Sequence, residues 1–145
     1  MRVNIYIESS VKGPRRSNGV VGFVLEEESH KDKTLTQFGK VENVTANQAV
    51  LLALIHALRR IKTGTDITIW TDSFYIQSAL VHGWLEEWSE NGWKTAKGKE
   101  ICNEKEWRQI KELLGDVEPE FEVGAQHPFK NYLKSEVERR SKRYV

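Results

Sequence analysis

The chain has 145 residues, of which 39% are hydrophobic and 30% are charged. This length and composition are typical of one globular domain that buries about two-thirds of its unfolded surface, and they exclude an intrinsically disordered chain. The 22 basic residues nearly balance the 21 acidic ones, so nucleic-acid binding would need a local basic surface rather than a high net charge.

The first half of the chain predicts three antiparallel strands followed by a helix. β-Branched and aromatic residues predict strands at 3–10, 20–28 and 34–41. Turn-forming Gly, Pro, Ser and Asn residues at 12–19 separate the first two strands. Apolar residues with helical spacing then predict a helix at 46–61, and Gly64 follows as a stop signal.

The second half predicts one strand, three helices, one strand and a final helix. The strands are expected at 66–72 and 118–125, and the helices at 73–90, 104–114 and 130–144, the first of them broken near His82–Gly83. The order βββ-α-β-α-α-α-β-α predicts an α/β fold, a mixed five-stranded sheet flanked by helices. No repeat or boundary divides the chain, so we expect a single domain over 1–145.

The cysteine count and the hydropathy pattern indicate a cytoplasmic protein. Cys102 is the single cysteine, which excludes an internal disulfide and a cysteine metal cluster. No leader-like segment opens the sequence, and no apolar run is long enough to span a bilayer. We therefore expect no membrane partner.

Three motifs occur in order along the chain. They are TANQAVLLALIHAL (45–58), ITIWTDSFYI (67–76) and GWLEEWSENGWKTAKGKEICNEKEW (83–107). Together they resemble, in the type 1 ribonuclease H family, the first long helix, the strand-to-helix junction carrying Thr-Asp-Ser, and the Trp-rich substrate-binding protrusion. The resemblance covers nearly the whole chain. It implies a ribonuclease H-like fold and, in intact members, metal-dependent cleavage of the RNA strand of RNA–DNA hybrids.

The resemblance also implies four metal-binding carboxylates, and this chain keeps only part of that set. Asp72 matches its position, and Glu8 stands where the family has Asp on the first strand. Val50 occupies the position of the helix Glu. For the last Asp, a frame anchored on the family's Asn selects Ser135, which we favour, whereas an ungapped count from the last strand selects Glu136.

Phosphodiester cleavage with two Mg²⁺ ions about 4 Å apart needs several converging carboxylates. Glu8 and Asp72 are the metal-ligand candidates, and two anions hold at most a single Mg²⁺ weakly, with Mn²⁺ as an alternative. Gln126 also stands where the family has a His before the last helix, with His127 one residue away.

The resemblance also implies a surface that contacts nucleic acid, and this chain has only part of the residues expected there. Its candidate residues are Lys12, Arg15, Arg16, Thr45, Asn47, Trp88, Trp93, Lys94, Thr95, Lys97 and Lys99. The acidic residues Glu86, Glu87 and Glu90 lie in the protrusion and reduce its attraction for phosphates. We therefore expect the turn at 12–19 and the basic segment at 139–143 to contribute more than the protrusion.

Structural roles are the alternatives for several of these residues. Asp72 precedes a helix and can act as its N-cap. Trp84 and Trp88 are four residues apart on a predicted helix, which favours mutual packing over base stacking.

Our leading hypothesis from the sequence is a ribonuclease H-related protein that binds an RNA–DNA hybrid or duplex with weak or no nuclease activity. A second hypothesis is an active ribonuclease H with a site rebuilt from Glu8, Asp72 and Glu136. A third hypothesis is a protein-interaction scaffold without nucleic-acid binding. The acidic helix around Glu86 is the observation that suggests it.

Overall fold

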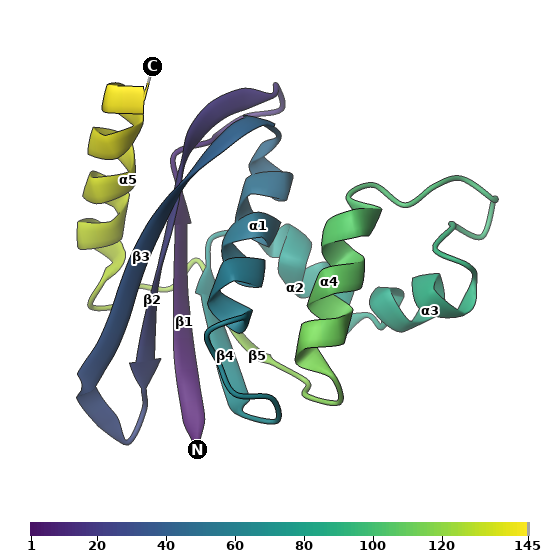
Figure 1. Cartoon of the computed structure of the whole chain (residues 1–145). Coiled ribbons are helices and arrows are strands. Elements are labelled where there is room, and N and C mark those ends of the chain that lie inside the picture. Colours follow the sequence, from purple (N-terminus) through teal and green to yellow (C-terminus); the bar gives the residue numbers. More distant parts are fainter. Residues whose placement is uncertain (145) are drawn as a thin grey trace.

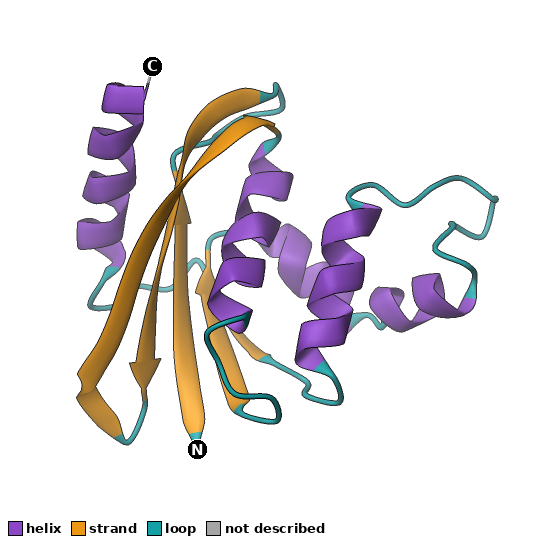
Figure 2. Ribbon diagram, viewed as in Figure 1, coloured by secondary structure: helices purple, strands orange, loops and turns teal. Residues whose placement is uncertain are grey.

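The strands form one mixed sheet in a computed structural model of the protein that describes residues 1–144 (Figures 1 and 2). The strands are β1 (Arg2–Ser9), β2 (Ser17–Glu27), β3 (His30–Val44), β4 (Asp66–Thr71) and β5 (Glu120–Val123). They lie in the order β3-β2-β1-β4-β5; β2 is antiparallel to both its neighbours, and β4 is parallel to both of its own. This topology confirms the predicted five-stranded sheet that begins with three antiparallel strands.

Helices cover both faces of the sheet. They are α1 (Ala46–Leu58), α2 (Phe74–Val81), α3 (Trp84–Glu90), α4 (Glu104–Leu114) and α5 (Lys130–Tyr144). Figure 1 shows α5 on one face and α1 on the other, with α4 packed beside α1 and with α3 and its loop projecting outward. None of the helices in residues 1–144 has the length and apolarity that crossing a bilayer requires.

Strand β1 is the centre of the sheet and is buried on both sides. Its positions 3–9 are all buried, because α1 covers the face that carries Ile5 and Ile7, whereas α5 covers the face that carries Tyr6. Close approach of α5 depends on Gly22, where a Cβ would lie 2.6 Å from the Phe38 ring and 3.4 Å from Val137. The sheet therefore has an apolar core on each face.

Several elements differ in length from the prediction: β2 begins at Ser17 inside the predicted turn, β5 covers Glu120–Val123 rather than 118–125, and β3 and α1 differ as well. Strand β3 extends beyond the predicted 34–41 because it pairs with β2 along most of its length, and ladder hydrogen bonds hold exposed polar residues in an extended conformation. Helix α1 ends at Leu58 rather than residue 61, since the amides of Arg60 and Ile61 bond to carbonyls three residues back in a tighter turn. The predicted helix break falls at Gly83, whose φ is 71°.

Candidate nucleic-acid and metal site

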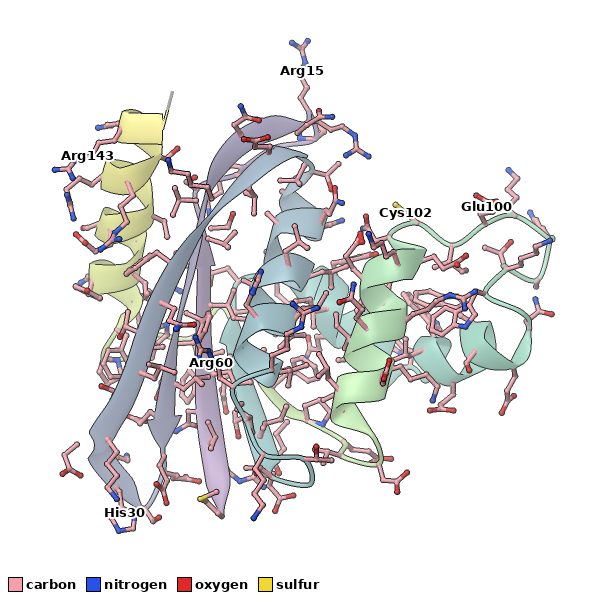
Figure 3. The ribbon with its side chains drawn as sticks, in the orientation of Figure 1. Arg15, His30, Arg60, Glu100, Cys102 and Arg143 are labelled. Atoms are coloured by element: carbon pink, nitrogen blue, oxygen red, sulfur yellow. The ribbon has the colours of Figure 1, made fainter. Side chains whose placement is uncertain are left out.

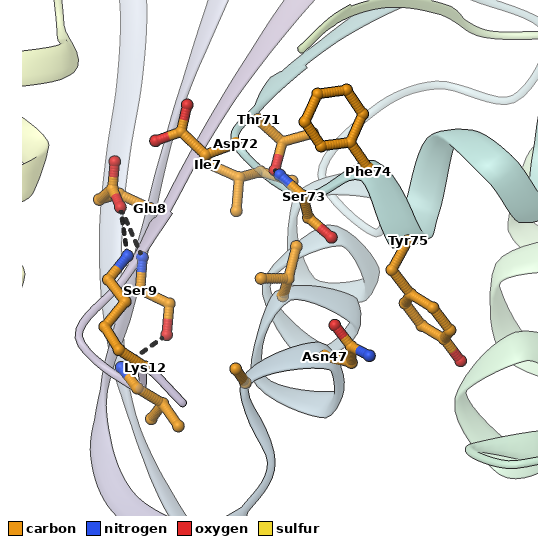
Figure 4. Close-up of a pocket in the computed structure, with 13 residues that line it drawn as sticks. Ile7, Glu8, Ser9, Lys12, Asn47, Thr71, Asp72, Ser73, Phe74 and Tyr75 are labelled. Atoms are coloured by element: carbon orange, nitrogen blue, oxygen red, sulfur yellow. Dashed lines mark hydrogen bonds and ion pairs between the residues drawn. The ribbon is translucent and has the colours of Figure 1, made fainter. Parts of the chain in front are cut away.

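A hollow lies where β1 and β4 end, beside the first turn of α1 (Figure 4). Because β1 and β4 are parallel neighbours, their carboxyl ends meet at one edge of the sheet, where open α/β sheets bind ligands. The hollow has a volume of about 290 Å³. Its lining residues include Glu8, Lys12, Asn47, Val50, Asp72, Ser73 and Phe74. The fold thus brings both metal-ligand candidates, Glu8 and Asp72, to one place.

Glu8 is a buried acid with a lysine partner. It is 7% exposed, near the end of β1. Its Oε1 accepts a hydrogen bond from Lys12 Nζ at 3.1 Å and a longer one from the Ser9 amide at 3.4 Å. The Lys12 side chain is largely exposed and reaches back from the turn after β1. Burial of the Glu8 carboxylate is thus compensated by a cation of the chain itself.

Asp72 also has a lysine partner, which comes from the far end of the chain. Its Oδ1 accepts a hydrogen bond from Lys130 Nζ at 2.8 Å. Lys130 is the first residue of α5, and its Nζ also donates to the Ala125 carbonyl at 3.4 Å. The N-cap of α2 is Ser73, which makes no side-chain cap bond. Asp72 therefore contacts α5 through Lys130.

The α1 wall of the hollow carries no acid. Val50 is half-buried there and packs against the larger core, and Ala46 and Asn47 line the same wall. Nearby, the Ser73 hydroxyl is buried and has no hydrogen-bond partner within the part of the chain that the structure describes. The exposed ring of Phe74 forms part of the rim.

The two candidates for the last carboxylate position lie on α5 outside the hollow lining. Ser135 is exposed. Glu136 accepts hydrogen bonds from Arg139 at 2.7 Å and Arg140 at 3.3 Å, and the Arg139 hydrogen bond lowers the pKa of its carboxyl. Glu136 is not among the residues that line the hollow with Glu8 and Asp72.

His127 is held among aromatic rings in the loop before α5. Its ring centroid lies 4.5 Å from that of Tyr6 and 5.8 Å from that of Trp70, and its Nδ1 accepts a hydrogen bond from the Phe129 amide at 3.2 Å. Burial, reinforced by the nearby Lys130 charge, lowers the pKa of His127 to about 4. The imidazole is therefore neutral near pH 7 and fixed in place, whereas the neighbouring Gln126 is exposed.

The donor set does not fit a pair of magnesium ions. Each of the two acids that line the hollow already forms an ion pair with a lysine ammonium group. Over residues 1–144, no three His, Cys, Asp or Glu side chains come together in a way that could hold a metal ion. Two divalent ions need more carboxylate charge than Glu8 and Asp72 supply.

Several of the candidate nucleic-acid contacts lie around this hollow. Asn47 lines it, and Thr45 caps α1 by accepting a hydrogen bond from the Gln48 amide. Arg16 donates to the Asn43 carbonyl at 2.9 Å and to Gln48 Oε1 at 3.2 Å, which ties the turn after β1 to the start of α1. Figure 3 shows Arg15 pointing outward from that turn.

The protrusion formed by residues 83–103 is packed through its tryptophans. The ring centroids of Trp84 and Trp88 are 6.2 Å apart, and those of Trp88 and Trp107 are 6.0 Å apart. Trp93 is 9% exposed, and the Arg108 guanidinium lies 4.9 Å from its ring centroid. The mutual packing predicted for Trp84 and Trp88 is thus present.

The polar groups of the protrusion shape its loop. Lys94 forms a β-bridge with Glu100, and Thr95 Oγ1 accepts a hydrogen bond from the Lys99 amide at 3.1 Å. Lys97 and Lys99 are exposed. The loop therefore presents lysine side chains, whereas its tryptophans belong largely to the packing beneath.

The sequence did not identify Lys130 as a site residue. It lies 58 positions from Asp72, and a lysine at the start of a helix carries no local signal of its partner. Its position directly after the His-Pro-Phe segment that precedes α5 was the available clue.

Comparison with solved structures identifies the class of fold to which this chain belongs. LC9-RNase H1, a type 1 RNase H with the type 2 active-site motif, has a TM-score of 0.73 at 22% identity, covering 99% of this chain and 74% of that one. The foamy viral protease–reverse transcriptase solved in complex with an RNA/DNA hybrid has a TM-score of 0.68 at 19% identity, covering 95% of this chain and 19% of that one. These neighbours show that the fold is ribonuclease H-like.

Sequence similarity then gives the family. The RNase H family model matches residues 1–124. The ribonuclease H of Francisella tularensis subsp. novicida (strain U112) is 35% identical over 113 residues, which cover 77% of this chain and 70% of that relative. The chain belongs to the RNase H family, whose members generally depend on divalent metal ions.

Proposed function

We propose that this protein binds an RNA–DNA hybrid or duplex and has weak or no nuclease activity. The observation that carries the proposal is that the hollow holds two acids, each paired with a lysine, beside the apolar Val50. Cleavage needs a cluster of carboxylates to hold two ions against the scissile phosphate. Two neutralised acids do not provide that charge. A single Mg²⁺ or Mn²⁺ ion at Glu8 and Asp72 would be held weakly.

The decisive test is metal-dependent cleavage of a labelled hybrid. The natural protein is expected to cut far more slowly than an intact family member in Mg²⁺ or Mn²⁺, whereas the double substitution Val50→Glu with Ser135→Asp is expected to gain activity. Adding Asp72→Asn to that double variant should abolish the gain. Cleavage by the natural protein at a rate comparable to an intact member would refute the proposal.

Binding itself is tested by the dependence of hybrid affinity on salt. Each phosphate contact adds about 0.9 to the slope of log affinity against log salt concentration for B-form DNA. We expect Arg15→Ala with Arg16→Ala to lower this slope more than Lys97→Ala with Lys99→Ala, which removes the same charge from the protrusion. Affinity that is absent, or insensitive to salt, would favour the protein-scaffold alternative instead.

A further inference from the structure

The position of Lys130 is set by the packing of α5. Its side chain is 17% exposed, and its ammonium group has two acceptors, Asp72 Oδ1 and the Ala125 carbonyl. Three residues further on, Leu133 is fully buried under the sheet face that α5 covers, and Val137 is 1% exposed. The ammonium is thus held beside the hollow by the folded helix.

The other lysine, Lys12, lies on a turn rather than a helix. Its side chain is 63% exposed, while that of its partner Glu8 is 7% exposed. An unpaired carboxylate at that degree of burial would be strongly unfavourable, so Lys12 supplies the neutralising charge. One partly buried cation and one largely exposed cation therefore serve the two acids that line the hollow.

The charges at the hollow balance without a metal ion. Two carboxylates and two ammonium groups sum to zero. A divalent cation would have to share the two carboxylates with Lys12 and Lys130, whose ammonium groups already donate to Glu8 Oε1 and Asp72 Oδ1. Binding of that cation is therefore opposed by repulsion from two nearby ammonium groups, each held by a charge-assisted hydrogen bond.

The lysines also keep donors for another ligand. An ammonium group has three N–H donors. The bonds described above use two on Lys130 and one on Lys12. The remaining donors suit the oxygen atoms of a backbone phosphate, which lysine binds as a point charge.

We infer that Lys12 and Lys130 replace divalent metal ions in this protein, so that a nucleic-acid phosphate binds at the hollow without any metal. The inference rests on the proposed nucleic-acid binding. It specifies the phosphodiester group as the ligand and the two lysines as positioning cations.

The test uses the full chain and the substitution Lys130→Met, with Lys111→Met as the matched control. Lys111 is also a partly buried lysine in an ion pair, with Glu86 at 2.8 Å, but it lies on α4 outside the hollow. Binding of Mn²⁺ is measured by electron paramagnetic resonance without nucleic acid. We expect Lys130→Met to bind Mn²⁺ more tightly, because Asp72 is then unpaired, while the natural protein and Lys111→Met bind it equally weakly. Equal Mn²⁺ binding by all three, or none by Lys130→Met, would overturn the inference.

Hybrid affinity gives the second readout. The natural protein should bind equally well in EDTA and in Mg²⁺ at matched ionic strength. Lys130→Met should bind about tenfold more weakly in EDTA, since a phosphate contact is lost and a carboxylate is exposed, and should recover in Mn²⁺. Dependence of the natural protein on a divalent ion for binding would contradict the inference.

Two further observations keep the outcomes separable. Lys130→Gln, which retains a donor toward Asp72 but no charge, should reproduce the loss of affinity if its circular dichroism spectrum is native. If no variant binds a hybrid, the proposed function fails, while the Mn²⁺ titration still decides whether the lysines exclude the metal.

Discussion

Two buried glutamates on one face of the sheet differ in the groups that compensate their burial. Glu26 is 5% exposed and accepts hydrogen bonds from Asn4 Nδ2 at 3.0 Å and Tyr6 Oη at 2.8 Å. Glu8 is 7% exposed and is paired with Lys12. Both glutamates lie on one face of the sheet. Asn4 pairs with Glu26 across the ladder, and Glu8 is four residues from Asn4 along β1, an even spacing that places both side chains on the same face. One acid is held by neutral donors inside the fold, and the other by a cation reaching in from solvent.

This contrast distinguishes Glu26, an acid that stabilises the fold, from Glu8, an acid that lines the hollow. The Glu26 network continues to Trp70, whose Nε1 donates to Asn4 Oδ1 at 3.2 Å. Burial, and then the hydrogen bond to Glu26, raises the pKa of Tyr6, which keeps its hydroxyl a donor. Every member of this network is a fixed neighbour within the sheet. The partner of Glu8 lies at the hollow and is largely exposed, so this ion pair can open without disturbing the sheet.

The largest expected effect comes from breaking the structural network. Glu26→Ala should lower the free energy of unfolding by about 3 kcal/mol, because it leaves the Asn4 amide and the Tyr6 hydroxyl buried without an acceptor. Urea unfolding measures this loss. The matched control is Glu27→Ala, the adjacent residue, whose partner His30 is exposed, and its expected cost is below about 1 kcal/mol.

A smaller effect is expected from the equivalent change at the hollow. Glu8→Ala should cost less than about 1 kcal/mol, since Lys12 is released into water rather than left buried and unpaired. The same urea experiment tests this value. A cost equal to that of Glu26→Ala would show that Glu8 is a structural acid too, and the contrast between the two glutamates would fail.

A further effect, which develops only on acidification, concerns the ring of His127 that packs on Tyr6. Its pKa in the folded state is about 4, below the unfolded value of 6.5, so the unfolded chain binds the proton more readily. The contribution to stability is complete above about pH 6.5 and is lost as the pH falls toward 4.

Substitution of this ring should flatten the pH dependence. His127→Phe keeps an aromatic ring but removes the titrating group, so the melting temperature should fall less between pH 6.5 and pH 4 than it does in the natural protein. Gln126→Phe adds a ring at the exposed neighbouring position and should leave the slope unchanged. An unchanged slope in His127→Phe would show that other groups cause the acid sensitivity.

Much of the fold was predictable because its signals are local. Period-2 and helical patterns placed the strands and helices within a few residues, and the α4 prediction of 104–114 matches the structure. The extension of β3 was not predictable, since exposed polar residues became a strand only through pairing with β2. Likewise, the shortened end of α1 depends on a tight turn that helical periodicity does not detect.

The site was predictable only in part. The sequence by itself determined that Asp72 follows a buried strand, that Glu8 stands at the end of the first strand, and that Val50 is apolar. These facts are properties of single positions within short segments, where local pattern and spacing decide the element.

Only the tertiary structure decided which charges meet. Lys130 reaches Asp72 from 58 residues away, and burial among rings supplied by β1 and β4 lowers the pKa of His127. Both outcomes depend on the docking of α5 and its preceding loop against the sheet. Electrostatic interactions and burial act through space, so side chains distant in the sequence determine whether an acid faces an ion, a lysine or water.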